Sequence, residues 1–288
     1  MATLRDMINQ ARADGYQDNN AEAKVCQDIV LKALSESSLC RNATIKGGVV
    51  MRSITGDSRR ATQDMDIDFI RYSISDDSIR AFIQTLDCLP DIHIAQTGKI
   101  TELRQQDYHG KRVFVQISDN TGDSIESKID LGVHKHLQIE QEEYCFDIGC
   151  FDDGANLLIN TKEQMFTEKL RSLLKFGPNS TRYKDIFDMC YLSGHMDIQR
   201  LKKCLHEFIF DDPGMRENNV EEACRRVKQT FASENYIKGL NKSLDRIITD
   251  GISDEINVHV LSCPSRITGD ASHHHAALDR GVSAKRAF

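Results

Sequence analysis

Residues 64–69 alternate strictly between acidic and apolar side chains, from Asp64 to Phe69, and Ile70 follows them. A period of two is typical of a β-strand, in which successive side chains point to opposite faces. This stretch therefore predicts a strand with three carboxylates on one face and Met65, Ile67 and Phe69 on the other. It constrains the fold more than any other stretch, because it fixes both a strand and the direction in which its acids point.

The rest of the chain changes its hydrophobic period at about residue 160. Before that point, helical and strand-like spacings are mixed, whereas after it only helical spacing is visible. We expect helices at 19–36, 49–56 and 76–89, and strands at 43–45, 91–97, 100–107, 111–118, 124–133 and 145–151. Further helices are expected at 162–176, 181–193, 197–209, 218–232 and 234–249. The predicted class is α+β, with an α/β domain at 1–155, a helical domain at 156–262 and a flexible tail at 263–288.

Composition excludes several classes of protein. The chain has 288 residues, of which 40% are hydrophobic and 28% charged, and no apolar run of about 18 residues that could span a membrane. Its first residues lack the apolar stretch of a secretory signal. The nine cysteines form no Cys-x-x-Cys pair, and most lie in apolar runs. We therefore expect reduced core thiols in a cytoplasmic protein with no membrane association.

The negative charge is concentrated in the N-terminal half. Residues 1–160 carry 17 Lys and Arg against 26 Asp and Glu, whereas residues 161–288 carry 20 against 18. A net charge of −7 argues against a basic nucleic-acid coat. Two interpretations of the acids stay open, which are a solvated surface and a set of metal ligands.

Two motifs 15 residues apart favour the second interpretation. Gly47 and Gly48 follow a predicted strand and precede a predicted helix, where backbone N–H groups suit a phosphate. Asp64 and Asp66 share one face of a strand and could hold Mg²⁺ through oxygen ligands. A two-metal site usually takes a third acid from a neighbouring strand, for which Asp130 is the candidate. Alone, the glycine pair could be a simple turn and the two acids exposed surface.

Four motifs together resemble the AbiEii/AbiGii toxin family within the polymerase-β-like nucleotidyltransferase superfamily. The resemblance covers about residues 20–195. It rests on Lys46-Gly47-Gly48, Asp64-Met65-Asp66-Ile67-Asp68, Glu168-Lys169-Leu170-Arg171 and Lys184-Asp185-Ile186-Phe187-Asp188. The first two mark the superfamily, and the last two mark the family. The resemblance implies a polymerase-β-like core with a mixed sheet, followed by a C-terminal helical bundle.

The resemblance also implies an activity, which is the transfer of a nucleoside monophosphate from an NTP with release of pyrophosphate. Lys46, Gly47 and Gly48 would bind the nucleotide, and Asp64, Asp66 and Asp130 would bind Mg²⁺ and act in catalysis. Lys169 would neutralise triphosphate charge, and Asp185 would act beside it. Members act as toxins of bacterial toxin–antitoxin or phage-defence pairs, and some modify tRNA ends. The resemblance therefore implies RNA such as tRNA, or protein, as the acceptor and an antitoxin as a possible partner.

The sequence departs from the family at Val49, where a Thr is usual, so that only backbone donors would contact the phosphate there. Read without the family, Lys169 could extend to solvent and Asp185 could be its partner or a helix-start acid. Basic residues at Arg171, Lys175, Arg182 and Lys184 could meet a nucleic-acid backbone or could be ordinary surface. Two other functions stay open, which are an aminoglycoside-type nucleotidyltransferase and an idle member that only binds a partner.

Overall fold

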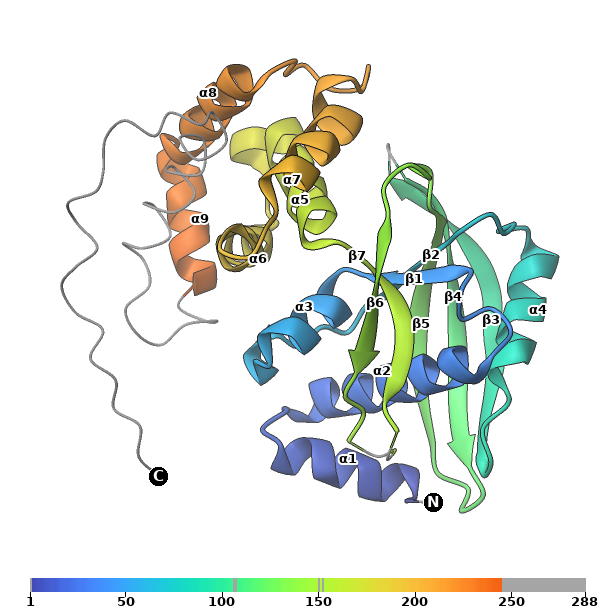
Figure 1. Ribbon diagram of the computed structural model, residues 1–288. Helices are drawn as coiled ribbons and strands as arrows, with labels where there is room; N and C mark the ends of the chain where they lie inside the picture. Colours follow the sequence, from blue (N-terminus) through green and yellow to red (C-terminus); the bar gives the residue numbers. More distant parts are fainter. Residues whose placement is uncertain (1, 106–107, 150, 152, 245–288) are drawn as a thin grey trace. The chain divides into compact units, whose positions relative to one another are not determined.

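The two parts of the chain form separate compact units in a computed structural model that describes residues 2–105, 108–149, 151 and 153–244 (Figure 1). The first unit runs from Met1 to Met165, and the second begins at Phe166. The first unit thus extends past residue 155, because a strand at 155–160 belongs to its sheet. The tail expected at 263–288 lies outside the described residues.

A seven-stranded mixed sheet forms the centre of the first unit, with the strand order β3-β4-β5-β2-β1-β7-β6. Its strands are β1 (Ala43–Lys46), β2 (Met65–Phe69), β3 (Ile92–Gln105), β4 (Tyr108–Asp119), β5 (Ser124–Val133), β6 (Gln141–Phe146) and β7 (Ala155–Asn160). The pairs β2–β5 and β1–β7 are parallel, and the other neighbours are antiparallel. The short strands β1 and β2 are therefore interior strands of the sheet.

Helices cover one face of this sheet (Figure 1). The helices of the first unit are α1 (Leu4–Ala13), α2 (Asp18–Glu36), α3 (Gly48–Thr55) and α4 (Asp76–Leu86), with a short 3-10 turn at Ser58–Arg60. The α2 helix packs against β5 and β7, and α4 packs against β3. Between them lies the core, to which β2 contributes Met65, Ile67 and Phe69, all fully buried. The alternation seen in the sequence is thus confirmed, since these apolar side chains share one face and Asp66 lies on the other.

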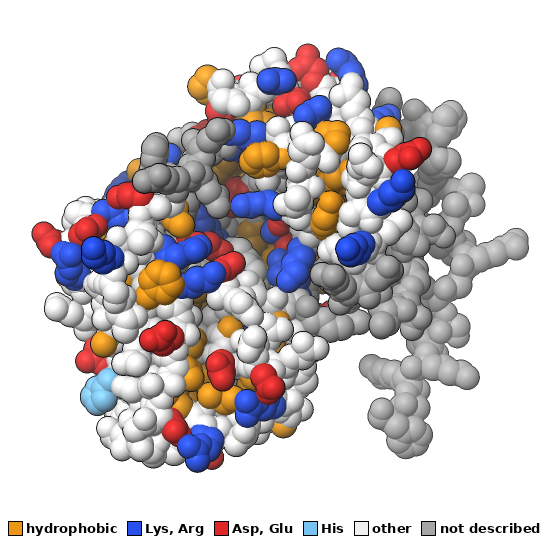
Figure 2. All heavy atoms as spheres, turned by 180° about the vertical axis from the view of Figure 1, so that it is seen from behind, with side chains coloured by type: hydrophobic (Ala, Val, Ile, Leu, Met, Phe, Trp, Pro, Cys, Tyr) orange, Lys and Arg blue, Asp and Glu red, His pale blue; other side chains and the backbone are white. Residues whose placement is uncertain are grey.

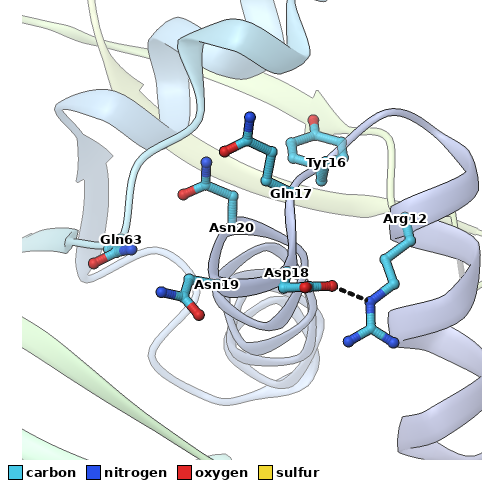
Figure 3. A pocket seen from close by; sticks show the side chains of 7 residues that line it. All are labelled: Arg12, Tyr16, Gln17, Asp18, Asn19, Asn20 and Gln63. Carbon is cyan, nitrogen blue, oxygen red and sulfur yellow. Dashed lines mark hydrogen bonds and ion pairs between the residues drawn. The ribbon is translucent and has the colours of Figure 1, made fainter.

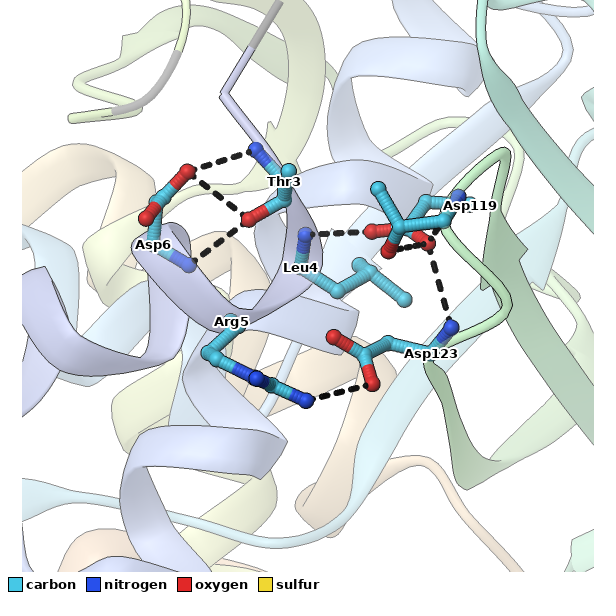
Figure 4. A network of polar contacts seen from close by, with 7 residues as sticks. Thr3, Leu4, Arg5, Asp6, Asp119 and Asp123 are labelled. Atoms are coloured by element: carbon cyan, nitrogen blue, oxygen red, sulfur yellow. Dashed lines mark hydrogen bonds and ion pairs between the residues drawn. The ribbon is translucent and has the colours of Figure 1, made fainter.

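The α1 helix was not predicted, and polar contacts attach its start to the turn between β4 and β5 (Figure 4). Thr3 and Asp6 form a reciprocal capping box. The backbone N–H of Leu4 donates to Asp119 at 2.8 Å, and Arg5 pairs with Asp123 at 3.0 Å. These contacts close the first helix onto the sheet and satisfy its exposed N–H groups.

The described residues from 162 to 244 contain helices and no strand. They are α5 (Lys162–Phe176), a 3-10 turn (Gly177–Asn179), α6 (Tyr183–Ser193), α7 (Ile198–Leu205), a π-helical turn (His206–Phe210), α8 (Val220–Phe231) and α9 (Glu234–Leu244). Thr161 caps α5 through the N–H of Gln164, as the capping-box pattern predicts. Within the described ranges, no helix is both long enough and apolar enough to cross a bilayer.

Three expectations about local structure were wrong. Strands predicted at 91–97 and 100–107 are one strand, β3, with an irregular register near Gly98, whose φ is +66°. The strand expected at 145–151 is shifted to β6, and β7 was missed. Cys26 and Cys204 are core thiols, but Cys88 and Cys145 are exposed. A short apolar run in the sequence does not show where a strand begins and ends, or whether a given side chain in it is buried in the fold.

Candidate active site

The turn between β1 and α3 requires glycine at two positions. Gly47 caps the helix with φ +69°, a left-handed conformation that disfavours other residues. A Cβ on Gly47 would collide with the carboxylate of Asp66, and a Cβ on Gly48 would lie 2.7 Å from the Cβ of Thr62. Both glycines therefore let the backbone pass close to the acidic strand and to the loop that precedes it.

The N-terminus of α3 has features that suit an anion. No side chain caps it, and its first turn carries no acid. Its leading N–H groups and the positive end of the helix dipole face the end of β1. Val49 is fully buried, so the residue that replaces the usual Thr packs in the core.

A row of charged residues crosses four strands in register. Lys46 on β1 lies opposite Asp66 on β2, and Asp66 lies opposite Asp130 on β5. Asp130 in turn lies opposite Arg112 on β4. Side chains in register on neighbouring strands share a face and lie about 5 Å apart at the backbone. The structure thus brings together Lys46, Asp66 and Asp130, three residues that the sequence placed on different strands.

Basic side chains neutralise the acids around Asp66. Arg112 forms a bidentate pair with Asp130, with Nε–Oδ1 at 2.6 Å and Nη2–Oδ2 at 2.7 Å. Lys128 lies 2.7 Å from Asp64, which directly precedes β2 and is exposed. Lys46 lies 2.7 Å from Asp68, and both of these side chains are largely buried.

The environment of Asp66 opposes its ionisation. Burial raises the pKa of Asp66 to about 6, and the negative charges of Asp130, Asp64 and Asp68 add to the shift, while Lys46 opposes it. A carboxylate in such surroundings gains from a nearby cation, because opposite charge favours the ionised form.

A buried polar network supports the loop that leads to Asp64. Gln27 on α2 donates to the carbonyl of Thr62 at 2.8 Å. Arg52 on α3 donates to the side-chain oxygen of Gln27 and lies 3.5 Å from Asp28. Gln27, Asp28 and Arg52 are all buried. The network thus links the helix behind the glycine turn to the loop that carries the first acid.

A polar pocket of 710 Å³ opens at the start of α2 (Figure 3). It is lined by Arg12, Tyr16, Gln17, Asp18, Asn19, Asn20 and Gln63. Arg12 and Asp18 pair with each other at 2.8 Å, and Gln63 directly precedes Asp64 in the chain. One residue of the pocket lining is therefore adjacent in sequence to the acidic strand, but none of the predicted site residues lines the pocket.

A second charged cluster lies in the second unit. Lys169 on α5 lies 2.9 Å from Asp185 and 2.8 Å from Asp188, both on α6. Although burial lowers the pKa of Lys169, the charges of Asp188 and Asp185 outweigh it and raise the pKa. Of the two alternatives for Asp185, the ion pair with Lys169 is therefore present.

Three partners of the predicted residues were missed from the sequence. Lys128 lies two residues before Asp130 on one strand, so its side chain shares that face. Arg112 would follow from pairing the predicted strands 111–118 and 124–133 as a hairpin. Asp188 lies three residues after Asp185, which places both on one side of a helix. For Lys128 and Asp188 the signal was a spacing within one predicted element, whereas for Arg112 it was the pairing of two predicted strands.

The acids around Asp66 differ in how readily their oxygens could bind a metal ion. In the described part of the chain, no group of three or more His, Cys, Asp or Glu side chains is arranged to hold a metal ion. Both oxygens of Asp130 are engaged by Arg112. Carboxylate oxygens at Asp64 and Asp66 are of the type that Mg²⁺ prefers, and the raised pKa of Asp66 fits a cation at this place.

Comparison with known proteins gives one family match. Residues 29–256 match the family described as "Nucleotidyl transferase AbiEii toxin, Type IV TA system". No curated protein matches the chain.

Two solved structures are similar at low sequence identity. JHP933 from Helicobacter pylori has 14% identity and a TM-score of 0.41, covering 80% of this chain and 97% of its own. An antigenic nucleotidyltransferase-like protein from Paracoccidioides brasiliensis has 15% identity and a TM-score of 0.43, covering 82% and 92%.

Proposed function

The chain belongs to the family of AbiEii nucleotidyltransferase toxins of type IV toxin–antitoxin systems, and we propose that it transfers a nucleoside monophosphate from an NTP to an RNA acceptor such as tRNA. The observation that supports this most is the register of Asp66 and Asp130 on adjacent parallel strands, next to the glycine turn. Carboxylates and phosphate-binding backbone then meet at one place, which is what phosphoryl transfer requires.

The triphosphate binds at the glycine turn in this proposal. Gly47 and Gly48 expose backbone N–H groups at the start of α3, and anions bind favourably there. Lys46, at the end of β1, supplies a positive charge next to Asp66 and Asp68. Since Val49 is buried, nucleotide binding at this turn relies on the backbone and on Lys46.

Asp64 and Asp66 would hold Mg²⁺, with Asp130 as the third donor once its contact with Arg112 is released. The metal ion supplies electrostatic stabilisation of the charge that develops on the phosphate oxygens. A cation near Asp66 would also lower the pKa of this carboxyl from its value of about 6, so that the carboxylate stays ionised during turnover.

The chemical step needs no protein nucleophile. The acceptor hydroxyl oxygen forms a bond to the α-phosphorus of the NTP, and the bond to the bridging oxygen breaks. Pyrophosphate leaves, and the hydroxyl proton passes to Asp130. Lys169 and Asp185 are also proposed to act in catalysis, and Asp188 helps to hold Lys169 in place.

The same proposal covers the assignment of the fold and the role of the protein in the cell. The sheet and its helices are the polymerase-β-like catalytic core, and the helices after β7 form the C-terminal bundle. The protein acts in the cytoplasm as the toxin of a toxin–antitoxin or phage-defence pair, with a cognate antitoxin protein as partner.

The test is to incubate the protein with Mg²⁺, each labelled NTP and total RNA. One NTP should label an RNA band, and Asp66→Ala should abolish the label because a metal ligand is lost. Asp77→Ala is the matched control, since this acid on α4 is almost fully exposed. Labelling that persists in Asp66→Ala would contradict the site. Label on small amines or on protein instead of RNA would contradict the proposal that RNA is the acceptor.

A further inference from the structure

One large hydrophobic side chain is exposed within a strand of the sheet. Phe114 on β4 is 41% exposed, whereas its neighbours Val113 and Val115 are fully buried on the helix-covered face. Isolated exposed hydrophobic residues are common on proteins. Among the described residues, however, the other large exposed ones, Leu137, Phe176 and Ile198, lie outside the strands.

The surroundings of Phe114 connect it to the candidate active site. Lys128 lies directly opposite on β5, and Arg112 and Gln116 flank it on the same face of β4. Lys128 pairs with Asp64, and Arg112 pairs with Asp130. Phe114 therefore lies next to both cations that contact the proposed catalytic acids.

The distance between Phe114 and Asp66 suits a single strand of nucleic acid bound across the sheet. Phe114 is two strands away from Asp66 and two residue positions further along, which corresponds to about 12 Å between the two Cα atoms. A ligand that reacts at Asp66 and continues along the open face would reach the ring of Phe114 within one or two nucleotides.

The side chains around the ring fit an unpaired nucleotide. A flat aromatic ring stacks on any base, cations contact the backbone phosphates, and an amide can read a base edge. Beside the ring, Arg112 and Lys128 provide the cations and Gln116 provides the amide. Figure 2 shows hydrophobic side chains exposed among Lys and Arg side chains on the surface. A paired base could not stack in this way, because its faces are covered within the duplex.

We propose that Phe114 is a stacking platform for an unpaired base of the RNA acceptor, close to the hydroxyl that receives the nucleotide. This inference rests on the proposed function and adds that the acceptor must be single-stranded at its reacting end. Arg112 and Lys128 then have two roles, since they pair with the acids and contact the acceptor backbone.

The chain contains no Trp, so Phe114→Trp creates a single fluorescent reporter at the proposed platform. We expect its fluorescence to be quenched saturably by a single-stranded oligoribonucleotide, and much less by a blunt duplex of the same sequence. Phe176→Trp is the matched control, because Phe176 is similarly exposed but lies on α5. Absence of quenching in Phe114→Trp, or equal quenching by duplex RNA or in the control, would overturn the platform.

Kinetics provide the second measurement. Phe114→Ala should raise KM for RNA about ten-fold or more, leave KM for the NTP unchanged, and be rescued by Phe114→Tyr. Phe176→Ala should change neither constant. If transfer to RNA depends on Asp66 but Phe114→Ala has wild-type KM, the platform is wrong and the proposed function stands. If the wild type transfers nothing to RNA, the proposed function fails, and the quenching result still decides whether Phe114 binds single strands.

Discussion

Replacing Asp66 with Asn should stabilise the fold while it removes activity. In the folded chain burial raises the pKa of Asp66 from 3.8 to about 6. The ionised form is therefore disfavoured by the fold, and each pKa unit corresponds to about 1.4 kcal/mol. A shift of about two units gives about 3 kcal/mol of unfolding free energy that is lost when Asp66 ionises.

The direction of the pKa shift determines the pH range over which Asp66 changes the stability of the fold. Since the folded pKa of Asp66 is higher than the unfolded one, the favourable contribution is complete below pH about 4 and disappears as pH rises through about 6. Asn carries no charge at any of these pH values. Asp66→Asn should therefore be up to about 3 kcal/mol more stable than the wild type at pH 7.5, and equally stable near pH 4.

Urea unfolding in EDTA at both pH values measures this difference. Asp77→Asn, on the exposed side of α4, should match the wild type at each pH. Added Mg²⁺ should stabilise the wild type more than Asp66→Asn, because the proposed metal ligand is retained only in the former. The reasoning is refuted if Asp66→Asn is equal to or less stable than the wild type at pH 7.5 without metal.

Three other substitutions probe separate parts of the structure. Gly47→Ala should lower the unfolding free energy by about 1–3 kcal/mol and abolish transfer, whereas Gly56→Ala, with a similar φ but open space around it, should cost only the backbone strain and keep activity. Lys169→Met should destabilise by about 3–5 kcal/mol in urea, because it leaves Asp188 buried without its cation, and an unchanged midpoint would contradict this. Gln27→Leu should cost about 1–3 kcal/mol and lower kcat more than KM for the NTP, and Gln27→Glu should partly restore stability by accepting from Arg52.

The local pattern of the sequence was sufficient for the acidic strand and for most of the helices. Strict alternation identified β2 and the direction of Asp66, and a third strand with an isolated acid identified Asp130. Both depend on short-range periodicity, which reports the face of an element directly. The family motifs added Lys169 and Asp185, which the structure joins in an ion pair.

The sequence did not reveal how charges are paired across strands. Whether Asp130 is held by Arg112, or Asp64 by Lys128, depends on the order and register of the strands, which join residues 18 positions apart in the first pair and 64 positions apart in the second. The same reason explains why β7 was missed. Its place beside β1 is set by a parallel pairing across more than a hundred residues, and its short apolar stretch gives little local signal.

The parallel pairing of β2 with β5 also has a consequence for synthesis on the ribosome. Asp66 and Asp130 are 64 residues apart in the chain, although they are neighbours in the sheet. At about 5–20 residues per second, Asp130 is made roughly 3–13 s after Asp66. During this interval the nascent chain has the glycine turn and the first acids but lacks the third. Under the proposed function, a chain released before β5 would lack the third acid, so transfer activity would appear only after most of the first unit has been translated.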